Sequence, residues 1–155
     1  MRSSMNNKRI HILVAEDDPD DCLLMKEAFR ECSIQSHLHF VHDGEELLDY
    51  LMHRDPFLDE KKYPKPGLIL LDLNMPRLGG REALGIIKAD PNLKVIPVVV
   101  FSTSCAEEDI SHSYESGVNA FISKPITYSG LVEVVRMLGR HWLDIVNLPI
   151  QEKGE

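Results

Sequence analysis

The sequence has few of the features that mark membrane, secreted or nucleic-acid-binding proteins. No apolar run approaches the roughly 20 residues that span a bilayer, and the polar stretch 1–9 lacks the apolar core of a signal peptide. The formal net charge is −8, with 17 Lys and Arg against 25 Asp and Glu, so no basic surplus is available to neutralise nucleic-acid phosphates. We therefore expect no membrane and no nucleic-acid partner.

The sequence has only three cysteines, Cys22, Cys32 and Cys105, at wide spacings and without a C-x-x-C pair. Such a set predicts neither a disulfide framework nor a zinc site. Free thiols in a reducing compartment are the simpler interpretation, and we expect a cytoplasmic protein.

The length of 155 residues and the hydrophobic fraction of 43% fit one globular domain with its own core. The sequence has no internal repeat and no low-complexity tract. We predict a flexible N-terminus at residues 1–8, one domain at 9–142, and a C-terminal extension at 143–155, where Pro149 and Gly154 disfavour helix.

Short apolar runs rich in β-branched residues alternate with segments of helical spacing. The runs predict strands at Ile10–Ala15, His37–Val41, Leu68–Leu71, Pro97–Phe101 and Ala120–Ile122. Helical stripes lie at 47–52, 83–87 and 131–142. Several runs are continuously apolar, as strands covered by helices on both faces require. The pattern predicts an α/β fold, a flavodoxin-like (βα)5 domain with a doubly wound parallel sheet in the order 2-1-3-4-5.

Polar side chains follow four of the five predicted strands. In an open parallel sheet, ligands bind beyond the carboxyl ends of the strands. Those ends carry Glu16, Asp17, Asp18, Asp72, Ser102 and Lys124. Each has an ordinary alternative role, since Asp17 and Asp18 before Pro19 suit a helix N-cap and Ser102 suits a cap of the next helix. Their convergence on one edge of the sheet favours a single reaction site.

The residue types at this edge suit phosphoryl transfer. Carboxylates that crowd together repel one another unless a cation lies among them, and an all-oxygen set selects a hard ion such as Mg²⁺. One carboxylate can then attack a phosphoryl group and form an aspartyl phosphate. Lys124 and Ser102 supply a positive charge and a hydrogen-bond donor for the phosphoryl oxygens.

The order of these motifs resembles the receiver domains of response regulators. The motifs are Glu16-Asp17-Asp18, Leu70-Leu71-Asp72-Leu73-Asn74-Met75-Pro76 with Gly79-Gly80, Ser102, and Lys124-Pro125, within a resemblance that runs from about Arg9 to Arg140. It implies that Asp72 is the phosphoacceptor for a sensor histidine kinase. It also implies a Mg²⁺ or Mn²⁺ ion held by Asp17, Asp18, Asp72 and the backbone carbonyl of Asn74.

The same resemblance gives roles to the remaining motif residues. Ser102 is implied as the switch hydroxyl and Lys124 as the phosphate-binding lysine. Phe121 matches the aromatic switch position, without the hydroxyl of the frequent tyrosine. A cis peptide is implied at Lys124-Pro125. A protein of this kind is not an enzyme beyond its own phosphorylation and slow dephosphorylation.

A narrower resemblance, to phytochrome-associated single-domain response regulators, rests on the long loop before Pro66, the stretch 96–104 and the ending 142–149. It implies a bacterial phytochrome kinase as phosphodonor in two-component phosphorelay signalling. It also implies a homodimer with a dimer arm at Trp142, Leu143, Leu148 and Pro149. The alternative is that these residues finish the last helix against their own domain.

Two other functions stay open from the sequence. A pseudo-receiver, which acts as a binding module without phosphorylation, usually lacks one of the acids or the lysine, and this chain has them all. A haloacid-dehalogenase-type phosphohydrolase also uses an aspartate nucleophile, but it needs an acid two residues later to protonate the leaving group. Here that residue is Asn74.

Overall fold

The computed structural model describes residues 10–103, 110–111, 115 and 117–143. Its strands are β1 (Ile10–Ala15), β2 (Ser36–Val41), β3 (Leu68–Leu71), β4 (Val98–Ser102) and β5 (Ala120–Ser123). They pair in parallel in one sheet of order β2-β1-β3-β4-β5. The predicted flavodoxin-like fold and its strand order are therefore confirmed.

Four helices have bounds within the described residues, and three of them begin at a capping side chain. They are α2 (Pro19–Glu31), α3 (Gly44–Leu51), α4 (Gly80–Ala89) and α6 (Tyr128–Leu138), the last continuing into the π-helical turn η1 (Gly139–Leu143). The side chains of Asp18, Asp43 and Thr127 each accept a hydrogen bond from a backbone N–H of the first turn of α2, α3 and α6. Such caps satisfy donors that a helix start leaves unpaired, and so they set where each helix begins.

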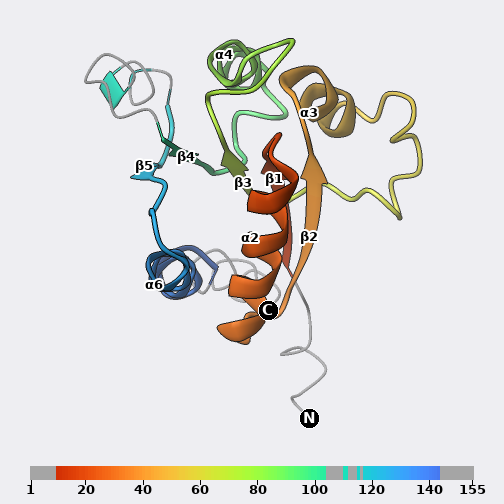
Figure 1. Cartoon of the computed structure of the whole chain (residues 1–155). Coiled ribbons are helices and arrows are strands. Elements are labelled where there is room, and N and C mark those ends of the chain that lie inside the picture. Colours follow the sequence, from red (N-terminus) through yellow and green to blue (C-terminus); the bar gives the residue numbers. More distant parts are fainter. Residues whose placement is uncertain (1–9, 104–109, 112–114, 116, 144–155) are drawn as a thin grey trace, which may run out of the picture.

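The helices cover both faces of the sheet (Figure 1). α2 packs against α6 and α3 packs against α4. Along β1, Leu13 and Ala15 join the core beneath α3 and α4, while Ile12 and Val14 join the core beneath α2 and α6. This alternation is the two-residue period of a strand. With both faces covered, the inner strands can be apolar at every position, which is the pattern that made them predictable.

The two ends of the chain lie outside the described residues, as do the side chains of Trp142 and Leu143. The flexible N-terminus and the dimer arm, with Leu148 and Pro149, therefore stay predictions. Among the described residues the cis peptide bond is Asp55–Pro56. The prediction of a cis bond at Lys124-Pro125 is therefore wrong. In the described part of the chain, no helix has the length and apolar character needed to cross a bilayer.

Candidate functional site

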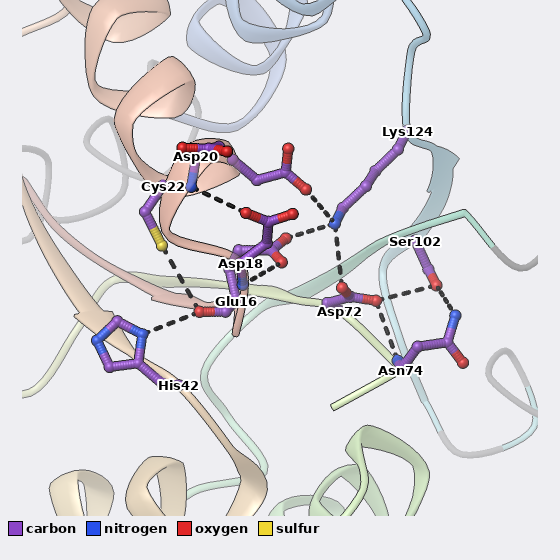
Figure 2. Close-up of polar contacts among 10 residues, drawn as sticks. Glu16, Asp18, Asp20, Cys22, His42, Asp72, Asn74, Ser102 and Lys124 are labelled. Atoms are coloured by element: carbon purple, nitrogen blue, oxygen red, sulfur yellow. Dashed lines mark hydrogen bonds and ion pairs between the residues drawn. The ribbon is translucent and has the colours of Figure 1, made fainter. Parts of the chain in front are cut away.

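The carboxyl ends of four strands bring acidic, hydroxyl and amine groups together (Figure 2). Glu16 follows β1, Asp72 follows β3, Ser102 ends β4, and Lys124 follows β5. The first three residues are buried, with 4%, 5% and 0% of their surface exposed, and the Lys124 side chain is 12% exposed. The fold thus places side chains that are far apart in sequence within one largely buried cluster.

Lys124 lies at the centre of this cluster. Its Nζ is 2.5 Å from Oε1 of Glu16, 3.1 Å from Oδ2 of Asp72 and 3.2 Å from Oδ2 of Asp21. Burial lowers the pKa of the Lys124 ammonium, but hydrogen bonds and charges from Glu16 and Asp72 outweigh burial and raise that pKa well above its usual range. Lys124 is therefore a fixed positive charge beside the Asp72 carboxylate.

The Asp72 carboxylate is held at both of its oxygens. Oδ2 accepts from the Lys124 ammonium, and Oδ1 accepts from the Ser102 hydroxyl at 3.1 Å and from the backbone N–H of Asn74 at 3.0 Å. The Asn74 side-chain amide donates in turn to Oγ of Ser102 at 3.3 Å. Figure 2 shows the side chains of Lys124 and Ser102 pointing toward Asp72, and the Asn74 side chain pointing toward Ser102. A carboxylate fixed in this way is oriented in advance, as a nucleophile requires.

Glu16 is anchored through its backbone as well as its side chain. Its carbonyl oxygen accepts from Sγ of Cys22 at 3.6 Å and lies 3.1 Å from Nδ1 of His42. Burial raises the pKa of the Glu16 carboxyl, Lys124 opposes this, and the nearby Asp72 charge raises it further. The site therefore holds more negative charge than one lysine balances.

This excess of carboxylate suits a divalent cation. Ligand oxygens of Glu16, Asp17 and Asp72 all lie within 4.8 Å of one another. Oxygen donors without histidine or cysteine are the set that Mg²⁺ and Mn²⁺ accept. Because the three acids face only one lysine, a cation would relieve their repulsion, and the residues present fit such an ion.

Asp18 is not part of this group, and metal binding by Asp18 stays a prediction. Asp18 is exposed, and its Oδ1 accepts from the backbone N–H of Asp20 at 2.9 Å as the N-cap of α2. Pro19 is the first residue of α2, and a proline at that position leaves the preceding residue as the cap. The structure places Glu16 beside Asp17 and Asp72 instead.

Asp21 was also missed, since nothing in the sequence marks it apart from its neighbours in the first turn of α2. Its contact with Lys124 depends on how α2 is rotated about its axis, which packing decides. Phe121 lies on β5 opposite Val100 and packs, half-buried, against the core on the α3 and α4 side. Its switch role stays a prediction, and so does metal binding by the Asn74 carbonyl.

A small cavity of about 110 Å³ opens beside Lys124, between α2 and the start of α6. Its lining includes the acidic Glu16 and Asp21 as well as the apolar Phe101 and Leu131. The volume suits a few water molecules rather than an organic cofactor. Ile126, at the rim, is fully exposed.

Comparison with known proteins agrees with this geometry. A family model described as response regulator receiver domain matches residues 12–136. The chain therefore belongs to the response regulator receiver domain family.

The relatives narrow this further. The chain is 38% identical over 138 residues to response regulator Rcp1 of Synechocystis sp., a match that covers 89% of this chain and 92% of Rcp1. The phosphorylated cyanobacterial phytochrome response regulator RcpA has a TM-score of 0.81 and 40% identity, covering 88% of this chain and 95% of RcpA. Response regulator RPA3017, from red light signaling of R. palustris, has a TM-score of 0.81 and 40% identity over 86% and 93% of the two chains. The Mn²⁺-bound form of Rcp1 has a TM-score of 0.79 and 37% identity over 86% and 94%. The chain is thus a receiver-type response regulator related to phytochrome response regulators.

Proposed function

We propose that Asp72 accepts a phosphoryl group from the histidine of a sensor kinase and that the phosphorylated chain signals through protein contacts. The observation that carries the proposal is the setting of Asp72. One of its oxygens accepts from the Lys124 ammonium at 3.1 Å, and the other accepts from the Ser102 hydroxyl at the same distance. A nucleophile, a fixed positive charge and a hydrogen-bond donor are what an aspartyl phosphate needs.

In the transfer, an oxygen of Asp72 forms a bond to phosphorus while the phosphorus–nitrogen bond of the donor histidine breaks. The donor imidazole leaves with the electron pair of that bond, and Asp72 becomes an acyl phosphate. Lys124 keeps its charge throughout, because Glu16 and Asp72 hold its pKa high. Its ammonium and the Ser102 hydroxyl then donate to phosphoryl oxygens.

Glu16, Asp17 and Asp72 would hold Mg²⁺ or Mn²⁺, with the Asn74 carbonyl as a further ligand. The related Rcp1 has been solved with Mn²⁺ bound. When bound, such a cation neutralises charge on the acids and on the phosphoryl group. The chain supplies three carboxylates whose repulsion Lys124 relieves only in part.

Ser102 would report the phosphorylation to the rest of the domain. Its hydroxyl now donates to Asp72 and accepts from the Asn74 amide. A phosphoryl group on Asp72 brings stronger acceptors than the carboxylate alone, so Ser102 would move toward it and leave Asn74. Phe121, on the strand next to Ser102, would repack in response.

The phosphodonor in this proposal is a bacterial phytochrome kinase, since RcpA is a phytochrome response regulator and RPA3017 acts in red light signaling. Exposed apolar side chains beside the site suit docking of a protein donor. They include Leu24, which is 41% exposed, and Ile126. With such a kinase as partner, the proposal includes a cytoplasmic location. It includes no nucleic-acid partner, because the net charge of −8 leaves no basic surplus to bind phosphates.

A homodimer through Trp142, Leu143, Leu148 and Pro149 is proposed on the sequence alone. Trp142→Ser or Leu148→Ser should shift the molar mass in solution toward that of a monomer. Phosphorylation of Asp72 should be unaffected in both variants. An unchanged molar mass across a range of concentrations contradicts the dimer arm.

The two other functions receive less support. In a phosphohydrolase of this type, the residue at position 74 has to be an acid that donates a proton to the leaving group. Here it is Asn74, whose amide is not an acid and donates a hydrogen bond to Ser102. A pseudo-receiver would bind its partner whether or not Asp72 carries a phosphoryl group. Turnover of a small phosphate ester tests the first, and partner binding by Asp72→Asn tests the second.

The deciding experiment is intact mass spectrometry after incubation with acetyl phosphate, with and without Mg²⁺. The wild type should gain one phosphoryl group only when Mg²⁺ is present, and Asp72→Asn should gain none. No adduct in the wild type at short times, either with acetyl phosphate or with a phosphorylated kinase, contradicts the proposal.

The same assay separates the two candidate metal sets. Glu16→Gln should raise the Mg²⁺ concentration needed for half-maximal phosphorylation, because Glu16 lies in the carboxylate group. Asp18→Asn is the matched control, since it removes one charge from the adjacent loop and keeps a side chain that can cap α2. A larger effect from Asp18→Asn would restore Asp18 as the ligand.

A further inference from the structure

Three histidines, one on β1 and two on the edge strand β2, lie together in the amino-terminal parts of these strands. His37 and His39 are two residues apart on β2, so their side chains share one face of the sheet. The strand register pairs His11 of β1 with His37, which places His11 on that face too. Glu16 lies five residues after His11, roughly 16 Å along the strand direction, so this cluster is separate from the site around Asp72.

The three imidazole rings are in contact. Nδ1 of His11 lies 3.0 Å from Nε2 of His39, and the ring of His37 stacks on that of His11 with centroids 4.9 Å apart. On the side toward α3, the ring of His39 contacts that of Tyr50. His37 is exposed and β2 is an edge strand, so the cluster is open to solvent on one side.

The contact between His11 and His39 is close to the spacing of two ligands on one ion. A neutral imidazole carries one N–H and one lone pair, so a single N–H lies between the two nitrogens. Nitrogens that bind one tetrahedral zinc ion at about 2.0–2.1 Å are about 3.4 Å apart. The observed 3.0 Å would have to open by only a few tenths of an ångström. The proton between the rings would move, through solvent, to the other nitrogen of its own ring, so both rings stay neutral.

The surroundings keep these two rings in the form that binds metal. Burial, and then His37, lowers the pKa of His11, while burial followed by His11 and His37 lowers the pKa of His39. A neutral imidazole has a free lone pair, whereas a protonated one has none. His11 and His39 therefore present lone pairs at neutral pH rather than positive charges.

We propose that His11, His37 and His39 form a second metal site, which binds one zinc-type divalent ion with water in the remaining position. The exposed His37 supplies the third nitrogen when its ring, now stacked on His11, turns about its side-chain bonds. Imidazole ligands favour Zn²⁺, Cu²⁺ and Ni²⁺, whereas the carboxylates around Asp72 favour Mg²⁺ and Mn²⁺. The ion would join the edge strand β2 to β1. This inference does not depend on the proposed phosphorylation.

The test is a titration of the full chain with Zn²⁺ against a chromophoric chelator, in excess Mg²⁺ so that the carboxylate site is filled. The wild type should bind one equivalent of Zn²⁺. His11→Gln, His37→Gln and His39→Gln should each weaken binding by more than the roughly 10–100-fold that loss of an outer-shell partner causes. His141→Gln, at an exposed histidine of η1, is the matched control and should bind Zn²⁺ as the wild type does.

Two further measurements separate this site from the one at Asp72. The imidazole ¹⁵N resonances of His11, His37 and His39 should shift on addition of Zn²⁺ to the Mg²⁺-loaded wild type, which requires no variant to fold. Asp72→Asn should bind Zn²⁺ normally, and the three histidine variants should still be phosphorylated. The proposal is overturned by the absence of Zn²⁺ binding in excess Mg²⁺, by unchanged affinity in any of the three variants, or by loss of Zn²⁺ binding in Asp72→Asn.

Discussion

Nζ of Lys124 lies 3.1 Å from an oxygen of Asp72 and also contacts Glu16 at 2.5 Å, so one ammonium contacts two buried carboxylates that follow two other strands and offsets part of their charge. The residue proposed to bind the phosphoryl group thus also stabilises the site before any phosphate arrives. Its removal should therefore affect stability as well as chemistry.

Lys124→Met should destabilise the folded chain. The variant leaves Glu16 and Asp72 buried without their partner, and breaking a buried pair of this kind costs about 3–5 kcal/mol of the free energy of unfolding. Mg²⁺ should stabilise the variant more than the wild type, because a bound cation would replace part of the missing charge. Urea unfolding with and without Mg²⁺ measures both effects. Equal stabilisation of the two proteins by Mg²⁺ would show that Lys124 and the cation do not share this task.

Gly80 should tolerate no side chain, because α4 begins directly against the backbone that carries Asp72. A Cβ at Gly80 would lie 2.4 Å from the carbonyl oxygen of Asp72 and 2.6 Å from Cα of Leu73. Gly80→Ala should lower the free energy of unfolding by about 1–3 kcal/mol, as overpacking does. It should also slow phosphorylation by acetyl phosphate, since the Asp72 backbone has to shift.

Gly85 offers a matched control in the same helix. A Cβ there meets nothing within 4 Å, so Gly85→Ala should raise the free energy of unfolding by about 0.5–1 kcal/mol through its better helix propensity. Its phosphorylation rate should equal that of the wild type. If Gly80→Ala proved as stable and as reactive as Gly85→Ala, the close packing against Asp72 would be refuted.

The strands could be predicted because each inner strand is buried on both faces. Leu68–Leu71 was predicted with its observed ends, and the run Pro97–Phe101 differs from β4 by one residue at each end. The strand order came from the flavodoxin-like fold class that the alternation of strands and helices indicates, and not from the sequence of any one strand. No local pattern encodes which strands pair, since pairing depends on contacts between residues far apart in the chain.

Only the site residues that lie at the carboxyl ends of strands could be predicted from the sequence. Asp72, Ser102 and Lys124 follow from the rule that parallel strands deliver their carboxyl ends to one edge. The sequence did not settle which of three consecutive acids lie together: the structure groups Glu16 and Asp17 with Asp72, and it uses Asp18 to cap α2. The histidine cluster was not foreseen at all, because the position of His11 beside β2 depends on the strand register.

Ionisation of Tyr50 should contribute to the fall in the free energy of unfolding at alkaline pH. Its buried hydroxyl donates to the carbonyl oxygen of Pro64 at 3.0 Å, and burial, followed by the neighbouring Tyr63, raises the pKa of Tyr50 to about 12 from its usual 10.0. Because the folded-state pKa is the higher one, this contribution to stability is complete below pH 10 and is lost as the pH rises through about 12.

Tyr50→Phe should therefore cost about 1 kcal/mol at pH 7, through the lost hydrogen bond. Above pH 10 its free energy of unfolding should fall less steeply than that of the wild type, so the two curves converge. Urea unfolding at pH 7, 10 and 11 provides the comparison. Curves that stay parallel across this range would mean that Tyr50 does not titrate with folding.

Cys22 should be protected from alkylation as long as the corner between β1 and α2 stays closed, which means that its thiol stays buried against the backbone of Glu16. Its Sγ donates to the carbonyl oxygen of Glu16 at 3.6 Å, and burial, with help from the Glu16 and Asp21 charges, raises the pKa of the thiol to about 11. The thiolate is the reactive form, and only about one molecule in a thousand carries it at pH 8, so the labelling reaction should be slow. Peptide mapping after iodoacetamide treatment should find Cys22 labelled slowly at pH 8, faster toward pH 11, and rapidly in urea.

Mg²⁺ should slow this labelling further, because alkylation of Cys22 requires the backbone of Glu16 to release Sγ. If Glu16 is a metal ligand, the bound cation holds that backbone in place. Glu16→Gln should abolish the effect of Mg²⁺ on the labelling rate, whereas Asp18→Asn should preserve it. Rapid labelling of native wild type at pH 8 would contradict the closed corner, and a Mg²⁺ effect that survives Glu16→Gln would remove Glu16 from the metal set.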